Sequence, residues 1–285
     1  MTLDGLITSM HGGFVFVRVD DRTVRCSARG RLKHRREGLL VGDRVVITPL
    51  TPATAVVESI GPRCSELLRP PVANADLAVL VQAAGEPAPS PALLDRMLIQ
   101  AQVAGLAVLI LWNKADLDRD LALELSHCYR SAGFTTWLTS TVTGEGVADL
   151  KHALAGRVSV IAGPSGAGKT SLLNAVTGGL TLKTQAVSAR SQRGRHTTRL
   201  TELLPLEGGG MVADTPGFTS LQLPSLKKTG LREFYPEYGP LEPGCFFRGC
   251  LHDQEPVCAV KKALDEGKLD RGRYERYRMF LAELE

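Results

Sequence analysis

Short runs of alternating apolar and polar residues fill the first quarter of the chain. Clear examples are residues 13–19, 23–27 and 44–48. Gly, Asp and Pro interrupt these runs about every ten residues, and short strands at this spacing are typical of a small all-β barrel or sandwich. We therefore predict an all-β domain over residues 1–67.

The pattern changes after Cys64 to unbroken apolar runs that are separated by segments with helical periodicity. The apolar runs are residues 77–81, 106–112 and 158–162, and the helical segments include residues 92–104 and 121–132. Buried parallel strands that alternate with helices produce this pattern. We predict an α/β domain over residues 68–223. Residues 224–285 form a third module, in which Pro, Gly, Cys and aromatic residues precede a charged helical tail.

Composition places the chain among ordinary folded proteins. Of its 285 residues, 44% are apolar and 22% are charged, which excludes disorder as the dominant state. The longest purely apolar run, residues 106–112, is far shorter than the roughly 20 residues of a membrane-spanning helix, and Asp4 interrupts any N-terminal secretory signal. We expect a cytoplasmic protein with no membrane partner, whose cysteines stay reduced.

Residues 163–170 match the phosphate-binding pattern G-x-x-x-x-G-K-[ST], and they lie between a predicted strand and a helix-forming segment, as the motif requires. Glycines let successive backbone N–H groups point inward, Lys169 reaches the β- and γ-phosphates, and Thr170 binds Mg²⁺. We predict a P-loop. Its phosphate-binding residues are Gly163, Ser165, Gly166, Ala167, Gly168, Lys169, Thr170 and Ser171.

A second motif, Asn-Lys-Ala-Asp at residues 113–116, identifies the base. The carboxylate of Asp116 can accept two hydrogen bonds from the edge of guanine, whereas adenine offers no such pair of donors. A further apolar run ends just before residue 139 and places the next loop beside the first. The predicted base-binding residues are Asn113, Lys114, Asp116, Ser140 and Thr141. The alternative is an ATP-dependent kinase or ATPase, in which residues 113–116 match by coincidence.

Residues 214–217, Asp-Thr-Pro-Gly, fit the D-x-x-G segment of GTPases. There Asp214 reaches Mg²⁺ through water, and the N–H of Gly217 meets the γ-phosphate. Many GTPases place a water-orienting Gln next, but this chain has Phe218, so unassisted hydrolysis should be slow. His196 is a candidate for the missing role, because imidazole can position water near neutral pH. The alternative is that His196 contacts only RNA or solvent.

Near the C-terminus, three cysteines and one histidine fall within fourteen residues: Cys245, Cys250, His252 and Cys258. This ligand set suits one tetrahedral Zn²⁺ ion with no open position, which is typical of a structural site. Phe246 and Phe247 inside the loop could contact RNA, but we expect them to form the small core of the module.

Basic residues gather in three places, although the formal net charge is only +4. They are residues 29–36, residues 183–199, and the tail, with Lys261, Lys262, Lys268, Arg271, Arg273, Arg276 and Arg278. A large RNA partner fits such a distribution. The tail helix either turns a basic face toward RNA or packs Leu264, Tyr274, Tyr277 and Leu281 on the body, and the sequence leaves both open. An RNA-binding structural factor whose nucleotide site is vestigial or only regulatory is a second candidate function.

The base-binding segments precede the P-loop, whereas in an ordinary small GTPase they follow it. Such circular permutation is possible, because the site is assembled from loops at the carboxyl ends of parallel strands. With this motif order the sequence resembles, over essentially its whole length, the RsgA (YjeQ) family of circularly permuted ribosome-associated GTPases. Gly194-Arg-His-Thr-Thr198 matches the family's switch I motif, G-R-H-T-T-T, except that Arg199 takes the last position.

The resemblance implies an N-terminal OB-like barrel that binds RNA, a central permuted P-loop GTPase domain and a C-terminal zinc-binding module with helices. Thr197 and Thr198 become joint candidates for the switch threonine linked to Mg²⁺. The implied function is a GTPase that binds the small (30S) ribosomal subunit and its 16S rRNA during late maturation. GTP hydrolysis stimulated by the ribosome would drive release, and we expect the chain to be a monomer.

Overall fold

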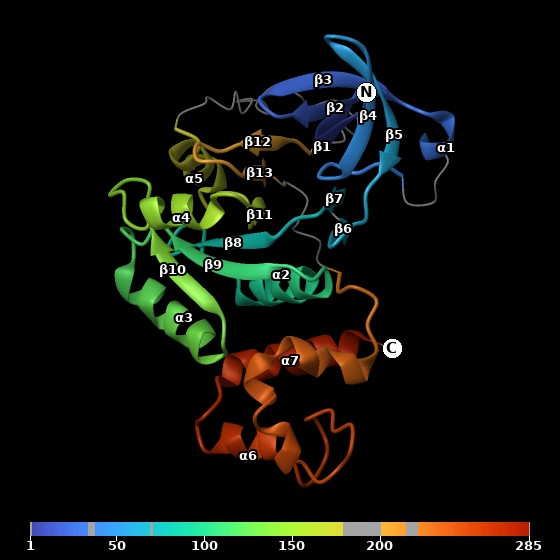
Figure 1. Ribbon diagram of the computed structural model, residues 1–285. Coiled ribbons are helices and arrows are strands. Elements are labelled where there is room, and N and C mark those ends of the chain that lie inside the picture. Colours follow the sequence, from blue (N-terminus) through green and yellow to red (C-terminus); the bar gives the residue numbers. More distant parts are fainter. Residues whose placement is uncertain (1, 34–37, 69–70, 179–200, 215–221, 285) are drawn as a thin grey trace, which may run out of the picture.

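The computed structural model of the chain describes residues 2–33, 38–68, 71–178, 201–214 and 222–284. In Figure 1 three parts follow one another from top to bottom: a barrel, an α/β sheet with its helices, and a C-terminal module. Within the described residues, no helix is both long enough and apolar enough to cross a membrane.

The N-terminal part is a closed barrel in the order β1-β2-β3-β5-β4, which confirms the predicted all-β domain. Its strands are β1 (Leu3–His11), β2 (Phe14–Val19), β3 (Arg22–Ala28), β4 (Arg44–Thr51) and β5 (Thr54–Ile60). Every second residue of β2 is buried, so Val15, Val17 and Val19 point inward. A short helix, α1 (Gly30–Lys33), follows β3, and residues 34–37 of the predicted basic segment lie outside the described residues.

A two-stranded hairpin of β6 (Glu66–Leu68) and β7 (Pro71–Ala73) leads from the barrel into a six-stranded sheet, order β10-β9-β8-β11-β13-β12. Five of its strands are parallel: β8 (Leu77–Ala83), β9 (Ala107–Asn113), β10 (Thr135–Thr139), β11 (Val158–Ala162) and β13 (Met211–Asp214). The edge strand β12 (Leu203–Pro205) is antiparallel. All residues of β8 are buried, as expected for a central strand covered on both faces.

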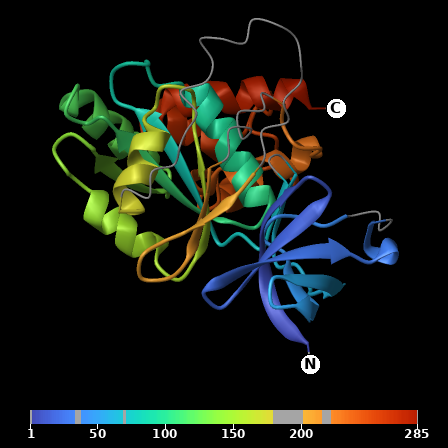
Figure 2. The ribbon, with the colours of Figure 1, turned by 90° about the horizontal axis from the view of Figure 1, so that it is seen from above.

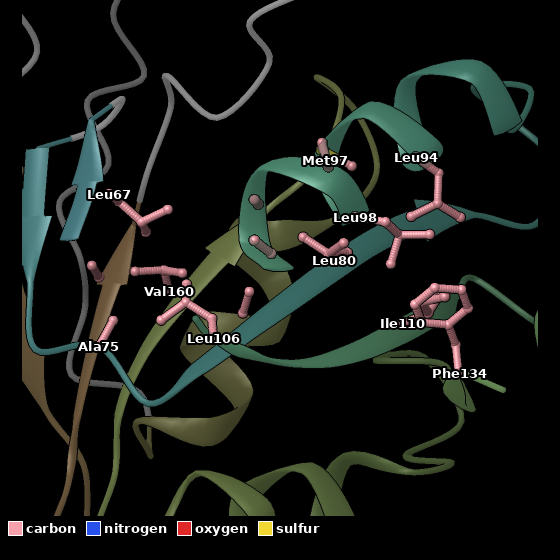
Figure 3. Packing of buried hydrophobic residues seen from close by; sticks show 14 of the residues in the cluster. Leu67, Ala75, Leu80, Leu94, Met97, Leu98, Leu106, Ile110, Phe134 and Val160 are labelled. Carbon is pink, nitrogen blue, oxygen red and sulfur yellow. The ribbon is translucent and has the colours of Figure 1, made fainter. Parts of the chain in front are cut away.

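Alternate residues of β8 supply two cores, one on each face of the sheet. On one face Leu80 packs with Ile110 and with Leu94, Met97 and Leu98 of α2 (Pro91–Val103), as Figure 3 shows. The same face carries α3 (Arg119–Ser131). On the other face Val79 and Val81 pack against α4 (Val147–Leu154) and α5 (Lys169–Val176). This three-layer arrangement confirms the predicted α/β fold (Figure 2).

The strand register brings the carboxyl ends of the parallel strands to one edge. Ala83 of β8 pairs with Asn113 of β9, and Asn113 pairs with Thr139 of β10. On the other side of β8, Ala162 pairs with Leu80. The loops after β8, β9, β10 and β11 therefore leave the sheet side by side, although the chain visits these strands in an order different from their order in the sheet.

The C-terminal module packs beneath α2 in Figure 1. It consists of three 3₁₀ helices, η1 (Lys228–Phe234), η2 (Pro236–Tyr238) and η3 (Glu242–Gly244), followed by α6 (Ala259–Asp265) and α7 (Arg271–Glu283). Leu264, Tyr274, Tyr277 and Leu281 are all buried in its core, together with Ile99 of α2. The packed arrangement of the tail is therefore confirmed.

A buried ion cluster joins this module to the sheet domain. Because Arg273 and Arg276 belong to this cluster, the alternative in which the tail turns its basic residues toward RNA is wrong for these two. Arg273 of α7 is 2% exposed and donates to Asp95 of α2 (2.7 Å) and to Glu237 (2.6 Å). Asp95 also accepts from Arg276 and from the Tyr129 hydroxyl. Burial lowers the pKa of Arg273, but the carboxylates outweigh burial and keep that pKa well above its usual value.

Because Asp95 is 1% exposed and neutralises two guanidinium groups, its removal should destabilise the chain strongly. Asp95→Asn keeps the shape but leaves positive charge uncompensated, and we expect it to lower the free energy of unfolding by about 3–5 kcal/mol. Urea denaturation measures this loss. Glu207→Gln, which breaks an exposed pair with Lys151, is the control and should change little. Equal losses in the two variants would contradict a structural role for the buried cluster.

Candidate nucleotide and metal sites

The predicted P-loop lies between β11 and α5, and at two of its glycines there is no room for a Cβ atom. Gly163 has φ +154°, and a Cβ there would lie 2.1 Å from the carbonyl oxygen of Val81. Gly168, at φ +88°, is the residue before α5, and a Cβ there would lie 2.2 Å from Nδ2 of Asn113. The loop is thus packed tightly against the ends of β8 and β9.

Lys169 is the first residue of α5 and folds back over the loop that precedes it. Its Nζ donates to the carbonyl oxygens of Gly163 (2.9 Å) and Pro164 (2.8 Å). The ammonium group is therefore held at the N-terminal end of a helix, where backbone N–H groups and the helix dipole also favour an anion. The loop's hydroxyl-bearing residues, Ser165, Thr170 and Ser171, are exposed.

Asn113 ties three loops together at the carboxyl edge of the sheet. It is the last residue of β9 and is 1% exposed. Its Nδ2 donates to the carbonyl oxygen of Ala167 in the P-loop (2.8 Å), and its Oδ1 accepts from the Thr139 hydroxyl (3.1 Å). A buried amide that satisfies donor and acceptor in this way fixes the distance between the loops.

The two predicted base-binding loops are also joined through their backbones. The N–H of Ala115 donates to the carbonyl oxygen of Thr139 (3.1 Å). Ser140 is fully buried, and its hydroxyl accepts from the N–H groups of Val142 and Thr143, so this side chain shapes its own turn. Asp116 is exposed and Thr141 is half-buried. The structure thus brings residues 113–116 and 139–141 beside the P-loop.

Other predicted site residues lie outside what the structure describes. These are His196, Thr197, Thr198 and Gly217. The backbone of Asp214 ends β13 and pairs with Ile161 of β11, so the D-x-x-G segment begins next to the strand that leads into the P-loop.

The sequence did not reveal one participant, the loop after β8. Lys114 donates from Nζ to the carbonyl oxygen of Glu86 in this loop (2.6 Å). A backbone carbonyl is present in every residue, so the type of residue at position 86 does not indicate this contact. The available signal was the position of the loop, because residues 84–90 follow the central strand at the edge where the other loops meet.

The predicted zinc ligands converge on one point. One ligand atom from each of Cys245, Cys250, His252 and Cys258 lies within 4.8 Å of all the others. The Nδ1 of His252 is 3.4 Å from Sγ of Cys258 and 3.7 Å from Sγ of Cys245. Tetrahedral bonds of about 2.3 Å to sulfur and 2.0 Å to nitrogen separate such atoms by roughly 3.5–3.8 Å, so the cluster has the dimensions of a four-coordinate metal site.

The surroundings of the cluster also suit a metal. His252 is fully buried, and Oε1 of Glu242 lies 3.4 Å from Nε2, so Nδ1 can face the ion. Burial raises the pKa of Cys250 to about 12 and also raises the pKa of Cys258. A divalent cation reverses this effect, since it binds the thiolate and displaces the proton. The cluster can therefore hold a metal ion.

The expectation that Phe246 and Phe247 form the module's core is wrong. Phe246 is 75% exposed and Phe247 is 43% exposed, and the two rings contact each other edge to face. The core is built mainly from residues outside the metal loop, such as Tyr238, Tyr277 and Phe280, together with the buried Cys250 and Cys258. A metal cluster fixes a short loop by itself, so the loop needs no apolar core of its own.

Gly168→Ala tests the packing of the P-loop on Asn113. The new Cβ would displace the amide from Ala167, and we expect the affinity for GDP to fall at least about tenfold. Gly156→Ala is the matched control, because its φ is +70° but nothing lies within 4 Å of the added Cβ. Titration with fluorescent GDP measures both. Equal affinities in the two variants would show that this contact does not shape the site.

Cys258→Ser tests the metal cluster. Elemental analysis of the purified wild-type chain should find one equivalent of bound metal, and Cys258→Ser should lose most of it, because a hydroxyl is a poor ligand for a soft site. Cys128→Ser removes a thiol of α3 outside the cluster and should retain the metal. Full metal content in Cys258→Ser would contradict the assignment of this ligand.

Comparisons with known proteins agree with this geometry. The family model described as RsgA GTPase matches residues 60–224, and the RsgA N-terminal domain matches residues 4–57. The small ribosomal subunit biogenesis GTPase RsgA of Moorella thermoacetica is 44% identical, covering 99% of this chain and 97% of its own. The same-named protein of Halalkalibacterium halodurans is 43% identical, with 98% and 96% covered.

Two solved structures are similar over the whole chain. The crystal structure of YjeQ from Thermotoga maritima superposes with a TM-score of 0.85 at 33% identity, covering 100% of this chain and 99% of that one. The structure of YloQ, a circularly permuted GTPase, superposes with a TM-score of 0.82 at 32% identity, with 100% and 95% covered. Family models, relatives and structures all agree, and the chain belongs to the RsgA GTPase family.

Proposed function

We propose that this chain is a GTP hydrolase that acts in the maturation of the small (30S) ribosomal subunit. The observation that carries the proposal is the hydrogen bond from Asn113 to Ala167, because it holds a guanine-specific motif against a phosphate-binding loop. The relatives described above are GTPases of small ribosomal subunit biogenesis, which supports the same activity and the same particle.

In this proposal guanine and phosphates bind to separate loops of one site. Asp116 accepts hydrogen bonds from N1–H and the amino group of guanine, and its exposure at the end of the β9 loop supports this role. Asn113, Ser140 and Thr141 support the base loop. Lys169 and the loop backbone neutralise the β- and γ-phosphates. The residues assigned to the phosphates are Gly163, Ser165, Gly166, Ala167, Gly168, Thr170 and Ser171.

A Mg²⁺ ion would be held by Thr170, by Asp214 through water, and by Thr197 or Thr198. The hydroxyl of Thr170 is exposed at the start of α5, and Mg²⁺ prefers oxygen ligands of this kind. When bound, the ion neutralises charge that develops on the phosphates during hydrolysis. The N–H of Gly217 completes the contacts to the γ-phosphate.

Hydrolysis requires an oriented water molecule, and Phe218 cannot supply this orientation. We assign the role to His196, which acts when the chain is bound to the 30S subunit. GTP favours the state docked on the subunit, and hydrolysis shifts the population toward release. The two nucleotide states thus differ in their affinity for the subunit, and the free energy of GTP hydrolysis sets the direction of the cycle.

The remaining assignments concern the metal and RNA. We propose that the cluster of three thiolates and one imidazole binds one structural Zn²⁺ ion, since this donor set is the one zinc prefers. The barrel (residues 1–67) and the metal module (residues 224–285) contact 16S rRNA on either side of the GTPase domain (residues 68–223). The chain acts as a cytoplasmic monomer.

Asp116→Asn tests the recognition of guanine. Xanthine carries a carbonyl where guanine carries the amino group, and an Asn side chain can donate to it. We expect the affinity for GTP to fall by roughly 100-fold or more and the affinity for xanthosine triphosphate to rise. Asp118→Asn, which retains the N-cap of α3, is the control and should keep GTP affinity. Unchanged GTP binding by Asp116→Asn would contradict the assignment of Asp116.

Purified 30S subunits test the proposed function itself. GTP turnover by the chain alone should be slow and should rise when subunits are added, because the partner completes the hydrolytic site. His196→Ala should bind GTP like the wild type but lose the stimulated turnover. Lys169→Ala should lose it as well and should also fail to leave the particle.

Turnover that does not respond to subunits would overturn the proposed function and favour an RNA-binding factor with a vestigial nucleotide site. Full stimulation of His196→Ala would leave the function intact but remove His196 from the mechanism.

A further inference from the structure

The loop after the central strand is held firmly against the candidate nucleotide site. At its start, the N–H of Ala84 donates to the carbonyl oxygen of Asn113 (2.7 Å). At its end, the N–H of Ser90 donates to Oε1 of Gln82 (3.2 Å), and Gln82 is fully buried. Both ends of the loop are therefore fixed to the β-sheet, and residues 85–89 between them project over the neighbouring loops.

Within this loop, the carbonyl oxygen of Glu86 accepts a hydrogen bond from the long side chain of Lys114, and we call this oxygen the anchor. Lys114 donates to it from Nζ at 2.6 Å. A Cβ added to Gly168 would lie 3.8 Å from Cε of Lys114, so the Lys114 stem passes over the P-loop just before α5. Lys114 also has φ +60°, a conformation that non-glycine residues adopt at a cost and that surrounding contacts must maintain.

The next residue, Pro87, holds the anchor in position. Its Cδ lies 3.2 Å from the place that a Cβ on Gly166 would take, so the pyrrolidine ring rests on the exposed turn of the P-loop. A ring fixed between the loop backbone and the P-loop leaves the preceding carbonyl little freedom. The contact of Pro87 with the P-loop thus restrains the carbonyl oxygen of Glu86, and that oxygen in turn holds the side chain of Lys114.

We infer that Glu86 and Pro87 position Lys114 across the guanine nucleotide site and thereby slow the release of bound nucleotide. The inference rests on the proposed function, because it takes the space between Lys169 and Asp116 as the nucleotide site. Lys114 lies beside that space, and a side chain that is already ordered loses less entropy when it contacts a ligand. Loss of such preorganisation appears mainly as faster dissociation.

Pro87→Gly tests the inference, with Pro89→Gly as the matched control in the same loop, outside the contacts just described. The measurement is the dissociation rate constant of fluorescent GDP from the full chain. We expect Pro87→Gly to release GDP about three- to tenfold faster than the wild type, and Pro89→Gly to remain within about twofold. Thermal unfolding checks that each variant is folded, and Pro87→Ala replaces Pro87→Gly if the glycine variant is not.

A double-mutant cycle separates positioning from general loosening of the fold. Lys114→Met keeps the stem but removes the ammonium group that Glu86 holds. In the Lys114→Met background, the proline substitution should therefore change the release rate by less than about twofold. The same fold-change in both backgrounds would overturn the inference, and so would wild-type release rates in Pro87→Gly. If the wild-type chain bound no GDP at all, the proposed function would fail instead.

Discussion

The site depends on a single buried amide. Asn113 ends the strand β9, and its side chain spans from the P-loop carbonyl of Ala167 to the hydroxyl of Thr139. Because the amide is out of contact with water, both hydrogen bonds must form within the protein, and this requirement sets the separation of three loops. The parallel register supplies the rest, since it places those loops at one edge of the sheet whatever their order along the chain. Circular permutation therefore changes the connections between strands and leaves the site intact.

The same permutation places the C-terminal module directly after the D-x-x-G segment in the sequence. This segment starts at Asp214, and the module that it precedes is fixed to α2 by the Asp95 cluster. Helix α2 begins one residue after the loop that holds Lys114. The site is thus connected to the module in two ways: along the sequence through residues 214–224, and through α2, which contacts the module by the noncovalent Asp95 cluster.

The sequence was sufficient for features that local chemistry dictates. The barrel strands follow from alternation, the P-loop glycines from backbone conformation, and the cluster of Cys245, Cys250, His252 and Cys258 from donor type and spacing. It failed where a residue's role depends on a distant partner. From the sequence, Arg273 looks like an exposed basic residue. In the structure it is buried and paired with Asp95, which lies 178 residues earlier in the chain. In the sequence Phe246 looks like a core residue, but in the structure its side chain is 75% exposed. The anchor at Glu86 is a backbone carbonyl, which no side-chain pattern reveals.

The central claim is that base and phosphate loops separated along the chain form one guanine nucleotide pocket. A crystal structure of the chain with GDP and Mg²⁺ tests it most directly. We expect both carboxylate oxygens of Asp116 to lie within hydrogen-bonding distance of the guanine N1 and amino nitrogens, while Nζ of Lys169 contacts the β-phosphate. A nucleotide bound with its base turned away from Asp116, or bound elsewhere on the protein, would contradict the account.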